Sequence, residues 1–178
     1  DAVIIAVTLN SAADHRPNER LVYKSQRIRK PFKAFYRDNS ATRNNMKNIS
    51  DRLKGDGYQT ALVADVHFQA DVADTAAKVV EKVRINPGNY IDPARKFKQI
   101  DYTDEEYQAE LERLRNRFVQ LLNICKEHKT ALRIGVNHGS LSDRIMSRYG
   151  DTPEGMVESC MEFLRVAVAE DFKDIVLS

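Results

Sequence analysis

Short apolar runs alternate with longer amphipathic segments along the chain. Strands are predicted where the runs are short and rich in β-branched residues, at 2–9, 60–68, 82–86, 131–137 and 174–178. Helices are predicted where apolar residues recur every three or four positions, at 42–55, 71–80, 104–128 and 153–169. This alternation indicates parallel strands joined by crossover helices, so we expect an α/β fold, either a doubly wound sheet or a (β/α) barrel.

The helix at 104–128 has the clearest signals. Its apolar stripe consists of Tyr107, Leu111, Leu114, Phe118, Leu121 and Cys125. Thr103 and Glu106 have the spacing of a capping box at its start. Thr152 and Pro153 predict the start of the last helix in the same way, as N-cap and first helical residue. Spacing places Met156, Cys160, Leu164 and Ala167 on one face of this helix.

Polar side chains interrupt three successive predicted strands. Because side chains alternate between the two faces of a strand, the polar residues of each strand share one face. These are Asp65 with His67, Arg84 with Asn86, and Arg133 with Gly135 and Asn137. A parallel strand covered on both faces is normally apolar throughout, and an unpaired buried polar group costs about 2–7 kcal/mol. The pattern therefore requires an explanation.

An anion site at the C-terminal ends of the strands is the explanation that we favour, because barrel enzymes keep their chemistry there. Arg84 and Arg133 would bind phosphate oxygens in a bidentate manner. Asn86, Asn89 and Asn137 would bind hydroxyl groups and bridging oxygens. The alternative is an internal ion-pair network, for example between Asp65 and Arg84, and Asp65 would serve in both.

Two histidines stand at the ends of these strands, His67 and His138. A structural and a catalytic role fit them about equally well. No third ligand is spaced to complete a metal site with them. The serines that follow, Ser140 and Ser142, are weak catalytic candidates because no Ser/His/Asp arrangement can be inferred without geometry.

Composition narrows the class of protein. The chain has 178 residues and a net charge of +2, with 42% hydrophobic residues, as in an ordinary globular domain. No run approaches the roughly 18 apolar residues of a membrane span. The two cysteines, Cys125 and Cys160, exclude a disulfide scaffold and fit a reducing compartment.

Charge is distributed unevenly along the chain. Residues 1–60 contain twelve Lys or Arg and six Asp or Glu, and the basic residues are densest at 16–37. Tyr and Phe residues are interleaved with them. This segment predicts either a surface for a polyanion or nucleic acid, or a solvated basic loop.

Four segments resemble a known family: LVADVHF (62–68), KVRINPGNY (82–90), YTDEEYQAEL (102–111) and ALRIGVNHGSLSDRIMSRYGDTPEGMVES (131–159). They are similar to 4-hydroxy-3-methylbut-2-enyl diphosphate synthase, the IspG or GcpE family of isoprenoid biosynthesis by the methylerythritol phosphate pathway. The insertion around 91–108 resembles the large three-domain type. Another phosphate-binding barrel, such as a pterin or aldolase relative, would not share the RINPGN and RIGVNHGS strings.

The resemblance implies an oxidoreductase with a TIM barrel that binds 2-C-methylerythritol 2,4-cyclodiphosphate and opens it reductively. It implies a 4Fe–4S cluster held outside this chain, ferredoxin or flavodoxin as electron donor, no membrane, and a homodimer in the full-length enzyme. The location would be the bacterial cytoplasm or the plastid stroma. By motif position, the diphosphate-binding residues are Arg84 and Arg133, the amides are Asn86 and Asn137, and Asp65 and His67 line the pocket.

The resemblance covers about residues 42–178, and residues 1–41 form a divergent basic segment. Five strands are predicted, against eight in a closed barrel of roughly 250 residues. We therefore expect a partial barrel that binds substrate, without the lysine motif that follows the strand at 174–178 in the family and without the cluster domain. Such a chain would be inactive alone, and the alternative is a non-catalytic barrel fragment that binds a polyanion through 16–37.

Overall fold

A computed structural model describes residues 4–9, 39–59, 61–66, 69–91 and 101–178, with side chains from Met46 onward. The basic segment 16–37 and His67 lie outside the described residues. The prediction of a polyanion surface and the proposed role of His67 therefore stay predictions.

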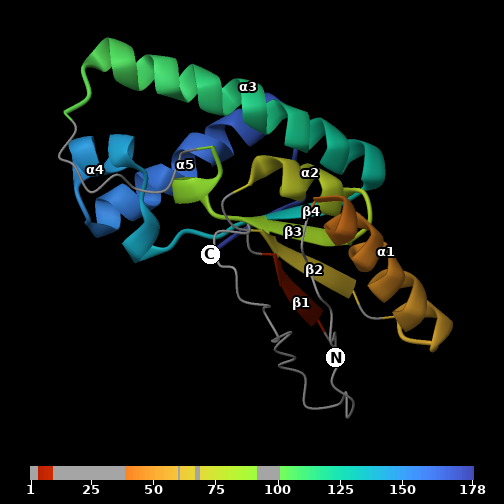
Figure 1. The fold of residues 1–178 in the computed structure, drawn as a ribbon. Helices are drawn as coiled ribbons and strands as arrows, with labels where there is room; N and C mark the ends of the chain where they lie inside the picture. The colour runs from red at the N-terminus through yellow and green to blue at the C-terminus, as the bar shows by residue number, and fades with distance from the viewer. Residues whose placement is uncertain (1–3, 10–38, 60, 67–68, 92–100) are drawn as a thin grey trace.

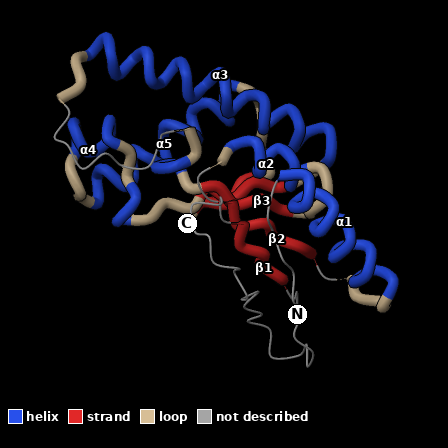
Figure 2. Tube along the Cα trace, in the orientation of Figure 1, coloured by secondary structure: helices blue, strands red, loops and turns tan. Residues whose placement is uncertain are grey.

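Five parallel strands form one sheet in the order of the sequence (Figures 1 and 2). They are β1 (Ile4–Leu9), β2 (Ala61–Val66), β3 (Lys82–Ile85), β4 (Ala131–Ile134) and β5 (Ile175–Leu177). A doubly wound sheet reverses its strand order near the middle, whereas a barrel adds each strand beside the last one. The consecutive order therefore favours the barrel. At the edge of the described sheet, Val176 and Leu177 of β5 are exposed.

Helices connect the strands and lie together on one side of the sheet (Figure 1). They are α1 (Asn39–Gly55), α2 (Ala70–Ala77), α3 (Asp104–His128), α4 (Asp143–Tyr149) and α5 (Pro153–Ala169). The predicted capping box of α3 is confirmed: Glu106 donates its backbone N–H to Thr103 Oγ1 at 3.2 Å, and Thr103 donates its own to Glu106 Oε2 at 2.9 Å. None of the helices in the described ranges combines the length and apolarity needed to cross a bilayer.

The hydrophobic core fills the space between the sheet and these helices. The strand residues in it are Leu62, Ala64 and Val66, Val83 and Ile85, and Leu132 and Ile134. These positions alternate with Asp65, Arg84 and Arg133, which consequently lie on the opposite face of the sheet. The fold thus separates an apolar, helix-covered face from a polar face.

An aromatic cluster fixes the position of the chain directly after β3. Tyr90 makes edge-to-face contacts with Phe118 of α3 and Phe163 of α5, with ring centroids 6.0 and 5.8 Å apart. The rings of Phe118 and Phe163 are 5.0 Å apart. This cluster joins the two long helices to the segment that follows Arg84.

The buried face of α5 differs from the expected one. Spacing predicted a face of Met156, Cys160, Leu164 and Ala167, but the buried residues are Gly155, Ser159, Glu162, Phe163 and Ala167. Two of them are polar, so hydropathy alone misplaced the face. The short helix α4 is not among the helices that the sequence predicts.

We predict that Phe118→Ala lowers the free energy of unfolding by about 3–5 kcal/mol, because it leaves a cavity among fully buried neighbours. Urea unfolding followed by circular dichroism measures this change. The control is Val157→Ala on the exposed side of α5, for which we expect a change within about 0.5 kcal/mol. Equal effects of the two substitutions would contradict the assigned core.

Candidate functional site

Three charged residues form a row across the middle of the sheet. The strand register aligns Asp65 of β2 with Arg84 of β3, and Arg84 with Arg133 of β4. In-register residues of parallel strands point to the same side, so the three side chains share the polar face. The shared face that the sequence predicts for these three residues is confirmed.

Arg84 lies at the centre of the row and is 8% exposed. One of its terminal nitrogens donates to Asp65 Oδ1 at 2.8 Å, and the other donates to the carbonyl of Gly135 at 2.9 Å. In the amide orientation that satisfies both of its polar atoms, Asn137 accepts a further hydrogen bond from Arg84 at 3.0 Å. The ion pair considered from the sequence therefore exists, and it fixes the guanidinium group rather than leaving it mobile.

Gly135 makes room for this guanidinium group. A Cβ added at position 135 would lie 2.4 Å from Nε of Arg84, closer than real side chains approach. Gly135, the glycine of the RIGVN string, is therefore needed because the side chain of Arg84 crosses the end of β4 at this position.

Arg133 differs from Arg84 because it is exposed. Its Nε donates to Ser178 Oγ at 2.9 Å. Within the described ranges, Arg133 has no carboxylate partner. Two arginines and one aspartate leave the row with one excess positive charge. Because guanidinium groups bind anions well, the position of Arg133 is the part of the row that most favours an anion.

The two loops that follow β3 and β4 fit closely together. Asn86, 2% exposed, donates from Nδ2 to Ser140 Oγ at 2.8 Å and accepts from the backbone N–H of Gly88 at 3.1 Å. A Cβ at Gly88 would lie 1.5 Å from the carbonyl oxygen of Ser140, so only glycine fits there. Each loop contains a short 3-10 helix, η1 (Pro87–Asn89) and η2 (His138–Ser140).

The remaining predicted amide and histidine occupy different surroundings. Asn89 is buried in η1, whereas His138 in η2 is exposed and lies 3.4 Å from Asp151. His138 therefore follows β4 closely in the sequence, but its side chain lies near the carboxylate of Asp151, in the segment before α5.

A metal centre does not arise from the described residues, since no three His, Cys, Asp or Glu side chains among them are grouped to hold an ion. Cys125 of α3 belongs to the core, and burial raises the pKa of its thiol to about 12. Burial also raises the pKa of Cys160, which packs against the same core from α5. Two protonated, core-facing thiols on different helices do not fit an iron–sulfur cluster, which requires thiolate ligands.

A buried charged cluster escaped the sequence prediction. Arg144 of α4 pairs with Glu162 of α5, and both are at most 3% exposed. Tyr107 of α3 donates to Glu162 Oε1 at 2.6 Å. Burial and this hydrogen bond raise the pKa of Tyr107. No local signal in the sequence marks this cluster.

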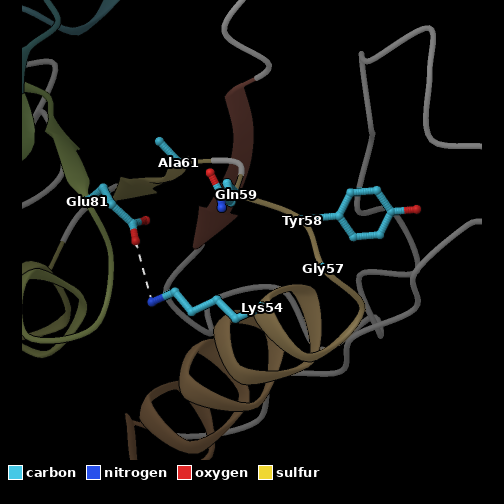
Figure 3. Close-up of a pocket in the computed structure, with 6 residues that line it drawn as sticks. All are labelled: Lys54, Gly57, Tyr58, Gln59, Ala61 and Glu81. Atoms are coloured by element: carbon cyan, nitrogen blue, oxygen red, sulfur yellow. Dashed lines mark ion pairs between the residues drawn. The ribbon is translucent and has the colours of Figure 1, made fainter.

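A hollow lies at the opposite ends of the strands, lined by Lys54, Gly57, Tyr58, Gln59, Ala61 and Glu81 (Figure 3). Lys54 pairs with Glu81 at 3.6 Å, and Glu81 also accepts the backbone N–H of Leu62 at 2.8 Å. The N-terminal ends of barrel strands serve stability rather than chemistry. The polar row is therefore the better candidate site.

The family model and the curated relatives that match this chain agree on one family. Residues 35–178 match the family model described as the GcpE TIM-barrel domain. A protein of Bacteroides fragilis named 4-hydroxy-3-methylbut-2-en-1-yl diphosphate synthase (flavodoxin) is 70% identical over 134 residues, which are 75% of this chain and 21% of that protein. A protein of the same name from Akkermansia muciniphila is 53% identical over 134 residues, covering 75% of this chain and 23% of that protein. The chain thus spans about a fifth of the length of the curated relatives it matches.

We predict that Gly135→Ala displaces Arg84 from Asp65 and lowers the free energy of unfolding by about 1–3 kcal/mol, as overpacking does. Thermal or urea unfolding measures the change. Gly139→Ala is the matched control, because a Cβ there meets no atom within 4 Å, and we expect a change within about 0.5 kcal/mol. If the two substitutions change the free energy of unfolding equally, Arg84 does not lie as close to Gly135 as the structure places it.

Proposed function

The chain belongs to the GcpE TIM-barrel domain family, and from this premise we propose that it is the substrate-binding barrel portion of a 4-hydroxy-3-methylbut-2-en-1-yl diphosphate synthase. The family membership confirms the resemblance seen in the sequence motifs. It also confirms the expected (β/α) barrel class, of which the five consecutive strands form a part.

The substrate that we propose is 2-C-methylerythritol 2,4-cyclodiphosphate, which the whole enzyme would open reductively with two electrons. The observation that carries the proposal is the in-register row of Asp65, Arg84 and Arg133 at the sheet face turned away from the helices. A cyclic diphosphate carries negative charge on oxygens that match the donor geometry of guanidinium groups. Arg133 would bind these oxygens directly, and Arg84, fixed by Asp65, would add positive charge beside it.

The other predicted residues support this site in different ways. Asn137 would bind substrate from the end of β4, where it also contacts Arg84. Asn86 and Asn89 would shape the wall of the site from η1, since both are buried. His67 remains a proposed pocket residue on the strength of the family motif, and His138 remains one because it directly follows the predicted strand 131–137.

The electron-transfer parts would lie outside these 178 residues. The names of the relatives include flavodoxin, and we propose flavodoxin as the electron donor of the whole enzyme. A 4Fe–4S cluster would supply the electrons at the substrate when bound, through ligands other than Cys125 and Cys160. We further propose a homodimer in the bacterial cytoplasm, as the resemblance implies.

We predict that Arg133→Ala and Arg84→Ala each weaken binding of inorganic pyrophosphate by about 10- to 100-fold. Loss of a hydrogen bond between charged groups costs about 1.5–3 kcal/mol, and each 1.4 kcal/mol is about tenfold in affinity. Isothermal titration calorimetry on the 178-residue chain measures both. Circular dichroism establishes that each variant is folded.

The matched control is Arg165→Ala on α5, because Arg165 is exposed and, among the residues that the structure describes, pairs only with Glu158 on its own helix. Its affinity for pyrophosphate should equal that of the wild type. The site assignment fails if the Arg84 and Arg133 variants bind as well as this control.

A further inference from the structure

The buried cluster of Tyr107, Arg144 and Glu162 joins three helices on the outer side of the sheet. Arg144 donates from Nε to Glu162 Oε1 at 3.3 Å and from a terminal nitrogen to Oε2 at 2.7 Å, a bidentate pair. Tyr107 also donates to Oε1, at 2.6 Å. The carboxylate of Glu162 is thus held from α3 and α4 at once.

The same cluster limits the movement of the loop that borders the polar row. Arg144 is the second residue of α4 and follows Ser140 by only four positions. Ser140 binds Asn86, and its carbonyl oxygen lies directly against Gly88. A shift of α4 would therefore move Ser140 either into Gly88 or away from Asn86.

A second set of contacts holds α4 from the start of α3. Tyr102 donates its backbone N–H to Ser147 Oγ at 3.0 Å, and the guanidinium of Arg148 lies 4.0 Å from the ring centroid of Tyr107. Arg148 also pairs with Asp104. These contacts lie nearer the surface than Glu162, so the buried carboxylate is the common point on which α3, α4 and α5 converge.

We infer that Glu162 is a positioning residue for the anion site: through Arg144 it holds the 138–142 loop so that Ser140 fixes Asn86 beside Arg84. This inference rests on the proposed function for the identity of the anion. Nothing in it requires Glu162 to touch substrate, because the carboxylate is enclosed by the helices.

Stability alone does not account for a buried ion pair at this place. Apolar residues of similar volume commonly stabilise a fold as well as a buried pair does, or better. A bidentate pair, in contrast, allows only one relative placement of the two helices. The close fit of Ser140 against Gly88 is the kind of contact that needs this accuracy, since displacements of about 1 Å are enough to impair a binding geometry.

The test separates positioning from stability by replacing the whole cluster with apolar residues. The variant Tyr107→Phe/Arg144→Met/Glu162→Leu leaves no unpaired charge or hydroxyl from the cluster. We expect it to unfold at a temperature close to that of the wild type, yet to bind inorganic pyrophosphate about tenfold more weakly. Hydrogen exchange at the backbone N–H of Gly88, which bonds to Asn86 Oδ1, should be faster in this variant.

A double-mutant cycle tests the route of the effect. Ser140→Ala alone should weaken pyrophosphate binding, whereas adding it to the triple variant should change the affinity little further, because the Ser140–Asn86 link is already lost. Additive losses would show that Glu162 does not act through this loop. The matched control is Glu158→Gln, a partly exposed, ion-paired carboxylate on the same helix, which should change neither the affinity for pyrophosphate nor the exchange at Gly88.

Each outcome decides the inference. Wild-type affinity and wild-type exchange at Gly88 in the triple variant would overturn it. If the triple variant does not fold, Tyr107→Phe alone removes one hydrogen bond to Glu162, and it must raise the exchange of Gly88 for the inference to survive. If the wild type itself fails to bind pyrophosphate, the proposed function is wrong, while the exchange readout still decides whether the cluster positions the loop.

Discussion

The ion pair between Asp65 and Arg84 is the interaction on which the candidate site depends. Arg84 is nearly buried in the middle of a parallel sheet, where an unpaired charge is costly, and breaking a fully buried pair costs about 3–5 kcal/mol. Asp65 keeps 30% of its side chain exposed, so the penalty here is smaller. The pair, together with the carbonyl of Gly135, fixes one arginine, and Arg133 beside it is the residue that we propose binds the anion.

The surroundings of this pair explain why glycines and amides recur in the two motifs. Gly135 leaves room for the guanidinium, and Gly88 lets the loop after β3 lie against the loop after β4. Asn86 joins the two loops through its side chain. The long family strings therefore encode a packing arrangement of two loops around one arginine.

Much of this arrangement could be predicted from the sequence. Period-two alternation correctly placed Asp65, Arg84 and Arg133 on one face, because a strand can expose only alternate residues. The helix α3 was predicted with its cap, because Thr103 and Glu106 are a local signal. Glu162 and α4 were missed, because burial of a charge depends on partners 18 and 55 residues away in sequence, which no local pattern reveals.

The central claim is that the polar row of β2, β3 and β4 binds the diphosphate of the substrate. A crystal structure of the chain with 2-C-methylerythritol 2,4-cyclodiphosphate tests it most directly. The account predicts phosphoryl oxygens within hydrogen-bond distance of the guanidinium groups of Arg133 and Arg84, with the Asp65–Arg84 pair retained. A ligand bound instead in the hollow beside Lys54 and Glu81, at the other ends of the strands, would contradict it.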